Sequence, residues 1–127
     1  LKKNLIIYDK TQHQVIQSDL FENVPQRYDF ILSNPPYIDP ALDRTEPSVK
    51  NNEPRIALYG GIDGLEIIHS IISTAHAHLN PSGQLWLEHE PEQVVALEKL
   101  AKENNFSITT HTDQYKVARY SVLTVAK

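Results

Sequence analysis

An apolar run that ends at two consecutive prolines constrains this chain more than any other feature of its sequence. Phe30–Leu32 has the composition of a buried strand in a parallel sheet, and Asn34-Pro35-Pro36-Tyr37 follows almost at once. Proline lacks the N–H that a sheet ladder needs, and it holds the residue before it in extended geometry. The strand must therefore end here, on a stiff backbone. This pattern predicts an α/β fold with residues 34–37 at the carboxyl end of a central strand.

The residue types in this segment favour a binding site. Ligands of open α/β sheets bind at the carboxyl ends of the strands. The side-chain oxygen of Asn34 and the carbonyl of Pro35 can accept the two N–H bonds of a planar NH2 group, while Tyr37 packs nearby. The alternative is that Asn-Pro-Pro is only a turn that ends the strand. The apolar strand before it and the aromatic residue after it favour the site.

Composition limits the class of protein. The 127 residues suffice for one modest domain, and the net charge of −4 argues against a protein that binds nucleic acid non-specifically. The chain has no cysteine, which excludes disulfides and thiolate metal sites. No apolar run approaches the length of a membrane span. We expect no metal site, no membrane association, no direct nucleic-acid binding and an intracellular location, in the cytoplasm or the mitochondrial matrix.

The rest of the chain shows helical and extended patterns in turn. Apolar residues recur at helical spacing from Leu65 to Leu79 and again from Val94 to Ala101. Two segments near the C-terminus alternate as an antiparallel strand pair does. We expect strands at 13–17, 30–32, 84–87, 106–111 and 120–126. We expect helices from Asp63 to Leu79 and from near Val94, turns at 58–61 and 80–83, and a long polar loop over the site at 38–52.

Three blocks of sequence carry a resemblance to a known family. Asn34–Tyr37 resembles the loop with which amino-methyltransferases that use S-adenosylmethionine hold the nitrogen to be methylated. Asn52–Leu58 and Gly60–Leu65 follow at the spacing found in the protein-(glutamine-N5) methyltransferases of the release-factor family. Leu87–Glu90 with Gln93 resembles the Glu-His-Gly-x-x-x-Gln stretch of that branch, with Glu90 where glycine is usual. The related ribosomal-protein glutamine methyltransferases match this third block less well.

The resemblance runs from about Leu1 to Lys127 and implies a class I S-adenosylmethionine-dependent methyltransferase fold, which is a Rossmann-like α/β sheet. The family's strand order is 3-2-1-4-5-7-6, and its glycine-rich cofactor loop follows the first strand. All four glycines here lie at position 60 or later, and Leu1–Asn4 resembles the tail of the helix after the second strand. We therefore expect residues 1–127 to be the C-terminal part of a catalytic domain, without its first two strands, with a C-terminal antiparallel pair and inactive alone. An open sheet edge beside Phe30–Leu32 would follow.

The resemblance also implies roles for single residues. It assigns catalysis to Asn34, Pro35 and Tyr37, and substrate binding to these three with Pro36 and Glu53. It assigns contacts with the S-adenosylmethionine cofactor to Asn34, to Asp19 at the exocyclic amine of the adenine, and to Leu20 over the ring face. Taken alone, Asp19 could equally cap a turn or helix, and Glu53 with Arg55 could form a solvated ion pair.

The activity implied is transfer of a methyl group from S-adenosylmethionine to the side-chain amide nitrogen of a glutamine, in the Gly-Gly-Gln loop of a peptide chain release factor. That release factor would be the protein partner. Three alternatives stay open: methylation of a glutamine in a ribosomal protein, methylation of a DNA adenine, and a non-catalytic fragment that binds peptides in the same cleft.

Overall fold

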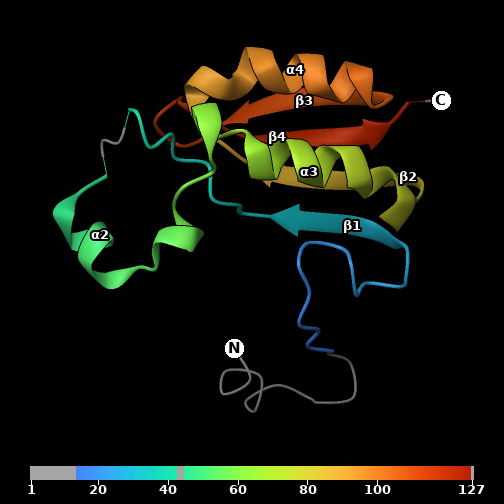
Figure 1. The fold of residues 1–127 in the computed structure, drawn as a ribbon. Coiled ribbons are helices and arrows are strands. Elements are labelled where there is room, and N and C mark those ends of the chain that lie inside the picture. The colour runs from blue at the N-terminus through green and yellow to red at the C-terminus, as the bar shows by residue number, and fades with distance from the viewer. Residues whose placement is uncertain (1–13, 43–44, 127) are drawn as a thin grey trace.

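The computed structural model describes residues 14–42 and 45–126, and it holds a four-stranded sheet with helices on one of its faces (Figure 1). Short 3-10 turns occur at Arg55–Ala57, Ile62–Gly64, His76–His78 and Pro91–Gln93. The strands and α-helices are β1 (Tyr28–Ser33), α2 (Pro47–Asn52), α3 (Glu66–Ala75), β2 (Leu79–Glu88), α4 (Val94–Glu103), β3 (Phe106–Thr112) and β4 (Ala118–Val125).

The sheet has the order β1-β2-β4-β3. β1 pairs with β2 in parallel, and β4 pairs antiparallel with both β2 and β3. This is the order 4-5-7-6 that the resemblance predicts for the C-terminal part of the sheet, so the predicted fold is confirmed. Parallel neighbours need a crossover, which α3 provides between β1 and β2.

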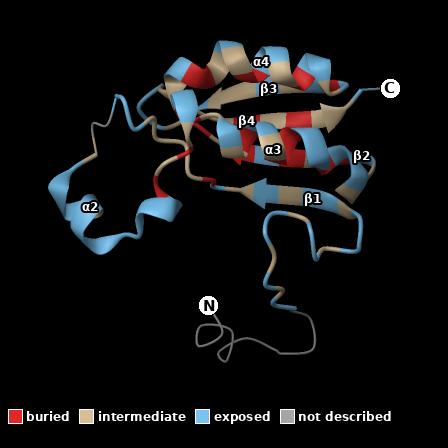
Figure 2. Cartoon of the chain, viewed as in Figure 1, coloured by how far each residue is buried: buried red, intermediate tan, exposed pale blue. Residues whose placement is uncertain are grey.

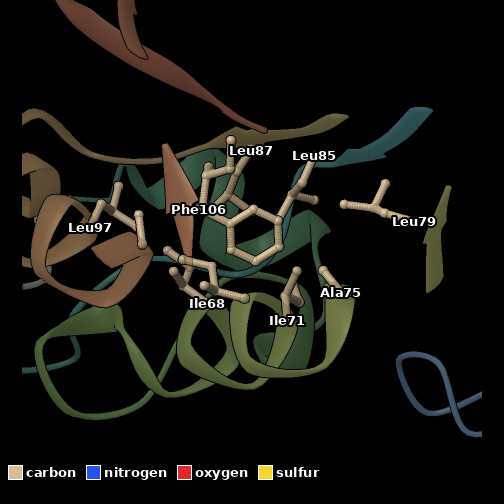
Figure 3. Close-up of a cluster of buried hydrophobic side chains, with 11 residues drawn as sticks. Ile68, Ile71, Ala75, Leu79, Leu85, Leu87, Leu97 and Phe106 are labelled. Atoms are coloured by element: carbon tan, nitrogen blue, oxygen red, sulfur yellow. The ribbon is translucent and has the colours of Figure 1, made fainter. Parts of the chain in front are cut away.

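The core lies between the sheet and the helices α3 and α4 (Figure 3). Helix α3 buries Ile68, Ile71, Ile72 and Ala75, whose spacing places them on one stripe of the helix. The buried side chains of the strands and of α4 complete this layer, among them Leu79, Leu85, Leu87, Leu97, Phe106 and Leu123. Helical periodicity in the sequence thus located both helices. However, α3 runs from Glu66 to Ala75 rather than from Asp63 to Leu79, and Leu79 is the first residue of β2.

The other face of the sheet is exposed in the part of the chain that the structure describes. Phe30 is 61% exposed, Leu32 is 76% exposed and Trp86 is 36% exposed. Tyr120 stacks between Trp86 and His111, with ring centroids 5.8 and 5.0 Å apart. Within the described residues β1 pairs only with β2, so the expected open edge beside Phe30–Leu32 is present, and β1 shows pale exposed patches in Figure 2.

Three expectations about local structure were wrong or incomplete. Residues 14–17 form no strand, because a strand needs a ladder partner and the described residues place none beside them; His13 and Leu1–Asn4 lie outside the described residues. The segment expected to be loop at 38–52 contains the six-residue helix α2, which begins at Pro47. Residues 80–83, expected as a turn, lie within β2, where the pairing with β1 is irregular between Tyr28 and Phe30.

Candidate functional site

A cleft of about 760 Å³ lies at the carboxyl end of β1. One wall is residues 34–39, which leave the strand, and another is the start of α4 with the turn before it. The rest comes from the segment between Leu42 and Leu65, which loops away from the sheet and carries α2 (Figure 1). The lining residues include Asn34, Pro35, Pro36, Tyr37, Glu53, Asp63, Glu90 and Gln93. The predicted segment 34–37 therefore borders a ligand-sized cleft at the expected end of the sheet.

Asn34 is exposed at this cleft, and none of the described residues hydrogen-bonds its carboxamide. Pro35 is buried, and the chain then passes Pro36 to Tyr37, both half-buried. Because the two prolines carry no N–H, this segment presents acceptors to the cleft with few competing donors. The arrangement can accept hydrogen bonds from an NH2 group.

Tyr37 is tied to the neighbouring strand. Its hydroxyl donates a hydrogen bond of 2.9 Å to Oε1 of Glu88, the last residue of β2. Burial, followed by the hydrogen bond to the Glu88 carboxylate and the charge of that carboxylate, raises the pKa of Tyr37 to about 12. Tyr37 is therefore a protonated donor at neutral pH, and its ring is held in place by a carboxylate.

The side chain of Gln93 joins three segments at the base of the cleft. Its Nε2 donates to the carbonyls of Tyr37 and Asp63, both at 3.0 Å, and its Oε1 accepts from the N–H of Glu90 at 3.0 Å. Gln93 is only 6% exposed. A buried amide without these partners would be costly, so the three segments are held together where they meet.

Two glycines allow the loop at 60–64 to approach segment 34–37. A Cβ on Gly60 would lie 2.6 Å from the carbonyl oxygen of Pro36. A Cβ on Gly64 would overlap the carbonyl oxygen of Tyr37, and the φ of Gly64 is +67°. Only glycine fits both the space and the backbone angle at position 64. The block Gly60–Leu65 is thus a close-packing element beside the cleft.

His89 belongs to a buried polar network behind the cleft. Its Nε2 lies 2.8 Å from Oγ of Ser121, which lies 2.9 Å from Oγ1 of Thr110, and its Nδ1 lies 2.9 Å from the carbonyl of Glu90. Burial lowers the pKa of His89 below 6.5, so the ring is neutral at pH 7. His89 is fully buried, so it orients the strand end and has no access to a substrate.

Glu90 stands where the resembling family usually has glycine, and its side chain has partners of its own. Its Oε2 accepts a hydrogen bond of 2.9 Å from Nη1 of Arg119, whose Nε lies 3.7 Å from Asp113. Glu90 also takes part in a capping box with Gln93 at the start of the turn Pro91–Gln93. The ion pair therefore joins the end of β2 to the start of β4 at the rim of the cleft.

The structure brings together most, but not all, of the predicted site residues. Glu53 lines the same cleft as segment 34–37, whereas Asp19 and Leu20 are exposed on the segment before β1 and are not among the lining residues. The resemblance covered Glu88 and Gln93 but gave them no role. The sequence signal that could have placed them at the site is the expected parallel pairing of β1 with β2, because parallel neighbours end at the same edge of the sheet.

In the described ranges no three His, Asp or Glu side chains form a metal-binding group, and no helix is long and apolar enough to cross a membrane.

Solved structures with the same fold are methyltransferases. A methyltransferase from Pyrococcus furiosus superposes with a TM-score of 0.56 and 18% identity, over 82% of this chain and 44% of that chain. A ribosomal protein L11 methylase from Lactobacillus delbrueckii gives a TM-score of 0.51 with 17% identity, over 87% of this chain and 42% of that one. At this identity the likeness establishes the fold, which is that of a class I methyltransferase.

Sequence comparison is more specific, although no protein-family model matches the chain. The release factor glutamine methyltransferase of Francisella tularensis is 39% identical over 107 residues, which are 84% of this chain and 38% of that protein. The one from Geobacter sulfurreducens is 46% identical over 76 residues, 58% of this chain and 27% of its own length. The ribosomal protein uL3 glutamine methyltransferase of Neisseria gonorrhoeae is 43% identical over 75 residues, 59% of this chain and 25% of that protein. The chain is therefore similar to glutamine methyltransferases over most of its own length, and it spans well under half the length of these relatives.

Proposed function

We propose that this chain is the C-terminal part of a methyltransferase catalytic domain that acts on the side-chain amide nitrogen of a protein glutamine, with S-adenosylmethionine as methyl donor. The observation that carries the proposal is the cleft at the end of β1, where the exposed Asn34 lies beside Pro35 and Tyr37. The relatives' names and the methyltransferase fold support it.

The chemistry of a glutamine explains why acceptors are needed at this place. An amide nitrogen is a poor nucleophile, because its lone pair is delocalised into the carbonyl. Two acceptors on its N–H bonds, the Asn34 side-chain oxygen and the Pro35 carbonyl, favour the positive charge that grows on nitrogen as the new bond forms. They also align the nitrogen, and alignment can lower a barrier by roughly 7–11 kcal/mol in favourable cases. The proton can leave after the methyl group has arrived, so no general base is required.

S-adenosylmethionine would supply a methyl group on a positively charged sulfur. The residues present fit the methyl-transfer end of such a site, since Asn34 and Tyr37 offer oxygen atoms at the strand end. The glycines are at 60, 61, 64 and 83, so no glycine-rich turn precedes β1 in this sequence. We propose that the longer protein supplies this turn from outside these 127 residues, and we expect the 127 residues alone to transfer no methyl group. Asp19 and Leu20 stay proposed contacts to the adenine.

The substrate we propose is the glutamine of the Gly-Gly-Gln loop of a peptide chain release factor. A glutamine with glycine neighbours can enter a narrow cleft, because glycine has no side chain and tolerates unusual backbone angles. The described lining of the cleft includes several carboxylates and no Lys, Arg or His, which suits a basic protein as partner. A ribosomal protein glutamine is the second candidate, because a uL3 methyltransferase is among the relatives.

The test uses the longer protein that contains this chain, with methyl-labelled S-adenosylmethionine and three acceptors offered separately: a release factor, ribosomal protein uL3 and DNA. Label should appear on the release factor and disappear when the loop glutamine is replaced by alanine. Label on uL3 or on DNA instead would overturn the substrate assignment.

Asn34→Ala should abolish transfer while weakening cofactor binding only in part, because it removes an acceptor that aligns the nucleophile. Asn51→Ala is the matched control, since Asn51 is exposed on α2 and is not among the residues that line the cleft. Near-normal turnover by Asn34→Ala would remove Asn34 from the mechanism. Binding of the release factor without any transfer by the unsubstituted protein would favour a non-catalytic peptide-binding module.

A further inference from the structure

The carboxamide of Gln93 has a fixed orientation, and no hydrogen-bonding capacity of its nitrogen is left over. Both N–H bonds of Nε2 are used, one on the carbonyl of Tyr37 and one on that of Asp63, and Oε1 accepts from the backbone of Glu90. Turning the amide over would place its oxygen against two carbonyl oxygens and its NH2 against an N–H. Because Gln93 is only 6% exposed, water cannot replace the partners that the turned amide would lose.

The two carbonyls that Gln93 holds lie at the two ends of the segment 38–62, the covering segment, whose described residues supply much of the lining of the cleft. Tyr37 begins the excursion from the end of β1, and Asp63 ends it just before α3. Where these two ends meet, at the base of the covering segment, the N–H of Ile38 donates to the carbonyl of Leu58, and the N–H of Gly60 donates to the carbonyl of Ile38, both at 3.0 Å. Gln93 reaches this base from the far wall of the cleft, at the turn between β2 and α4.

The conformations at both ends depend on the same contact. Asp63 adopts a left-handed backbone (φ 54°) that is uncommon for a residue with a side chain, and its carbonyl accepts the hydrogen bond from Gln93. Gly64 follows with φ +67°, and its Cα lies so close to the Tyr37 carbonyl that no Cβ fits. Loss of the Gln93 amide would release both carbonyls at once.

We propose that Gln93 is a positioning residue: through its hydrogen bonds to Tyr37 and Asp63, it sets where the Asn34–Tyr37 segment lies relative to the covering segment, and hence where the substrate amide is held. The inference rests on the proposed function of this cleft. Gln93 acts through the backbone of Tyr37, and its own polar atoms are all engaged within the protein. A misplacement on the order of 1 Å at a reacting centre can cost about 100-fold in rate.

The first experiment separates turnover from binding in the longer protein. Gln93→Met keeps the length of the side chain and removes its hydrogen bonds. We expect kcat per folded molecule to fall about 10- to 100-fold, with the KM for S-adenosylmethionine changed by less than about threefold. Gln84→Met is the matched control: Gln84 lies on β2 and is not among the residues that line the cleft, and within the described part of the chain its Oε1 accepts only from the indole of Trp86, at 3.1 Å. A kcat within about threefold of the unsubstituted protein would overturn the proposal.

Gln93→Glu serves as the second variant if the methionine variant does not fold. It keeps the acceptor for the N–H of Glu90 but sets a carboxylate oxygen against the carbonyls of Tyr37 and Asp63. It should therefore lower kcat at least as far as Gln93→Met does, whereas a purely space-filling role predicts near-normal kcat.

The second experiment needs no activity, so it separates failure of this inference from failure of the proposed function. Amide hydrogen exchange should speed up about tenfold or more at Ile38 and Gly60 in Gln93→Met, with exchange in β4 unchanged. Unchanged exchange at Ile38 and Gly60 would show that Gln93 does not hold the base of the covering segment. If the unsubstituted protein transfers no methyl group to any acceptor, the proposed function fails and the exchange result alone decides the role of Gln93.

Discussion

Replacing Gly64 by alanine should destabilise the protein more than the same change at Gly61, although both glycines have positive φ. The φ values are +67° and +80°, and a side chain in this region costs roughly 1–2 kcal/mol. Alanine also restricts the unfolded chain more than glycine does, and this offsets about 0.4–1 kcal/mol of that cost at either position. Backbone strain alone therefore predicts a loss of about 1 kcal/mol for each variant.

The two positions differ in what the new Cβ meets. At Gly61 it overlaps the side chain of Glu66, which is exposed and can swing away. At Gly64 it overlaps the carbonyl of Tyr37 and lies 2.6 Å from Nε2 of Gln93, so the backbone must move and both hydrogen bonds of that amide are lost or strained. At about 1 kcal/mol for each bond, Gly64→Ala should lose about 3 kcal/mol in all.

Urea unfolding of the two variants beside the unsubstituted protein measures this difference. With m between about 1 and 3 kcal/mol/M, the predicted 2 kcal/mol or so between the variants corresponds to a midpoint shift on the order of 1 M. An unfolding free energy for Gly64→Ala equal to or above that of Gly61→Ala would refute the reasoning, since it would mean that the contact of Gly64 with Tyr37 can relax without cost.

Three further predictions concern the buried histidine, the tyrosine and the sheet edge. Burial lowers the pKa of His89 in the folded protein below 6.5, its ordinary value in the unfolded chain. Between the lowered pKa and 6.5 the unfolded chain binds more protons than the folded one, so the unfolding free energy should rise with pH through that window and level off above it. Urea unfolding at a series of pH values should show this slope, and His89→Gln should remove the part of it that His89 contributes. Because the pKa of Tyr37 is raised to about 12, Tyr37 should ionise at a higher pH in the folded protein than in the unfolded chain, and its stabilising contribution should be lost as pH rises from 10 through 12. In Glu88→Gln this ionisation, followed by phenolate absorbance, should occur at lower pH. An unmoved ionisation would exclude a contribution from the Glu88 carboxylate. Leu32→Lys should reduce self-association of the 127-residue chain in light scattering, since it places a charge on the open edge of β1, and unchanged association would show that this edge is not the contact.

Local patterns in the sequence predicted much of the fold. The apolar stripe of Ile68, Ile71, Ile72 and Ala75 predicted α3, because a helix that buries one face must repeat its apolar residues at this spacing. The prolines after Ser33 predicted the end of β1, because no proline can donate to the ladder. The order of the four strands came from the family resemblance, and the observed sheet agrees with it.

Local pattern failed where pairing decides the conformation. Residues 14–17 have the composition of a strand, yet a strand exists only beside a partner. Residues 80–83 have the composition of a turn, yet they lie within β2, and Ser82 there adopts a φ of 67°. Both outcomes depend on neighbouring segments, which a local pattern does not contain.

By itself, the sequence determined that Asn34, Pro35 and Tyr37 stand at the end of a strand, since the prolines act on their own backbone. Only the tertiary structure decided what holds them there. Glu88 follows Tyr37 by 51 residues and Gln93 follows it by 56, and they meet Tyr37 because the parallel register pairs Ser33 with Leu87 and brings both strand ends to one edge. A hydrogen bond needs its two atoms within a few tenths of an ångström of the right separation, and only the packed sheet sets distances so finely.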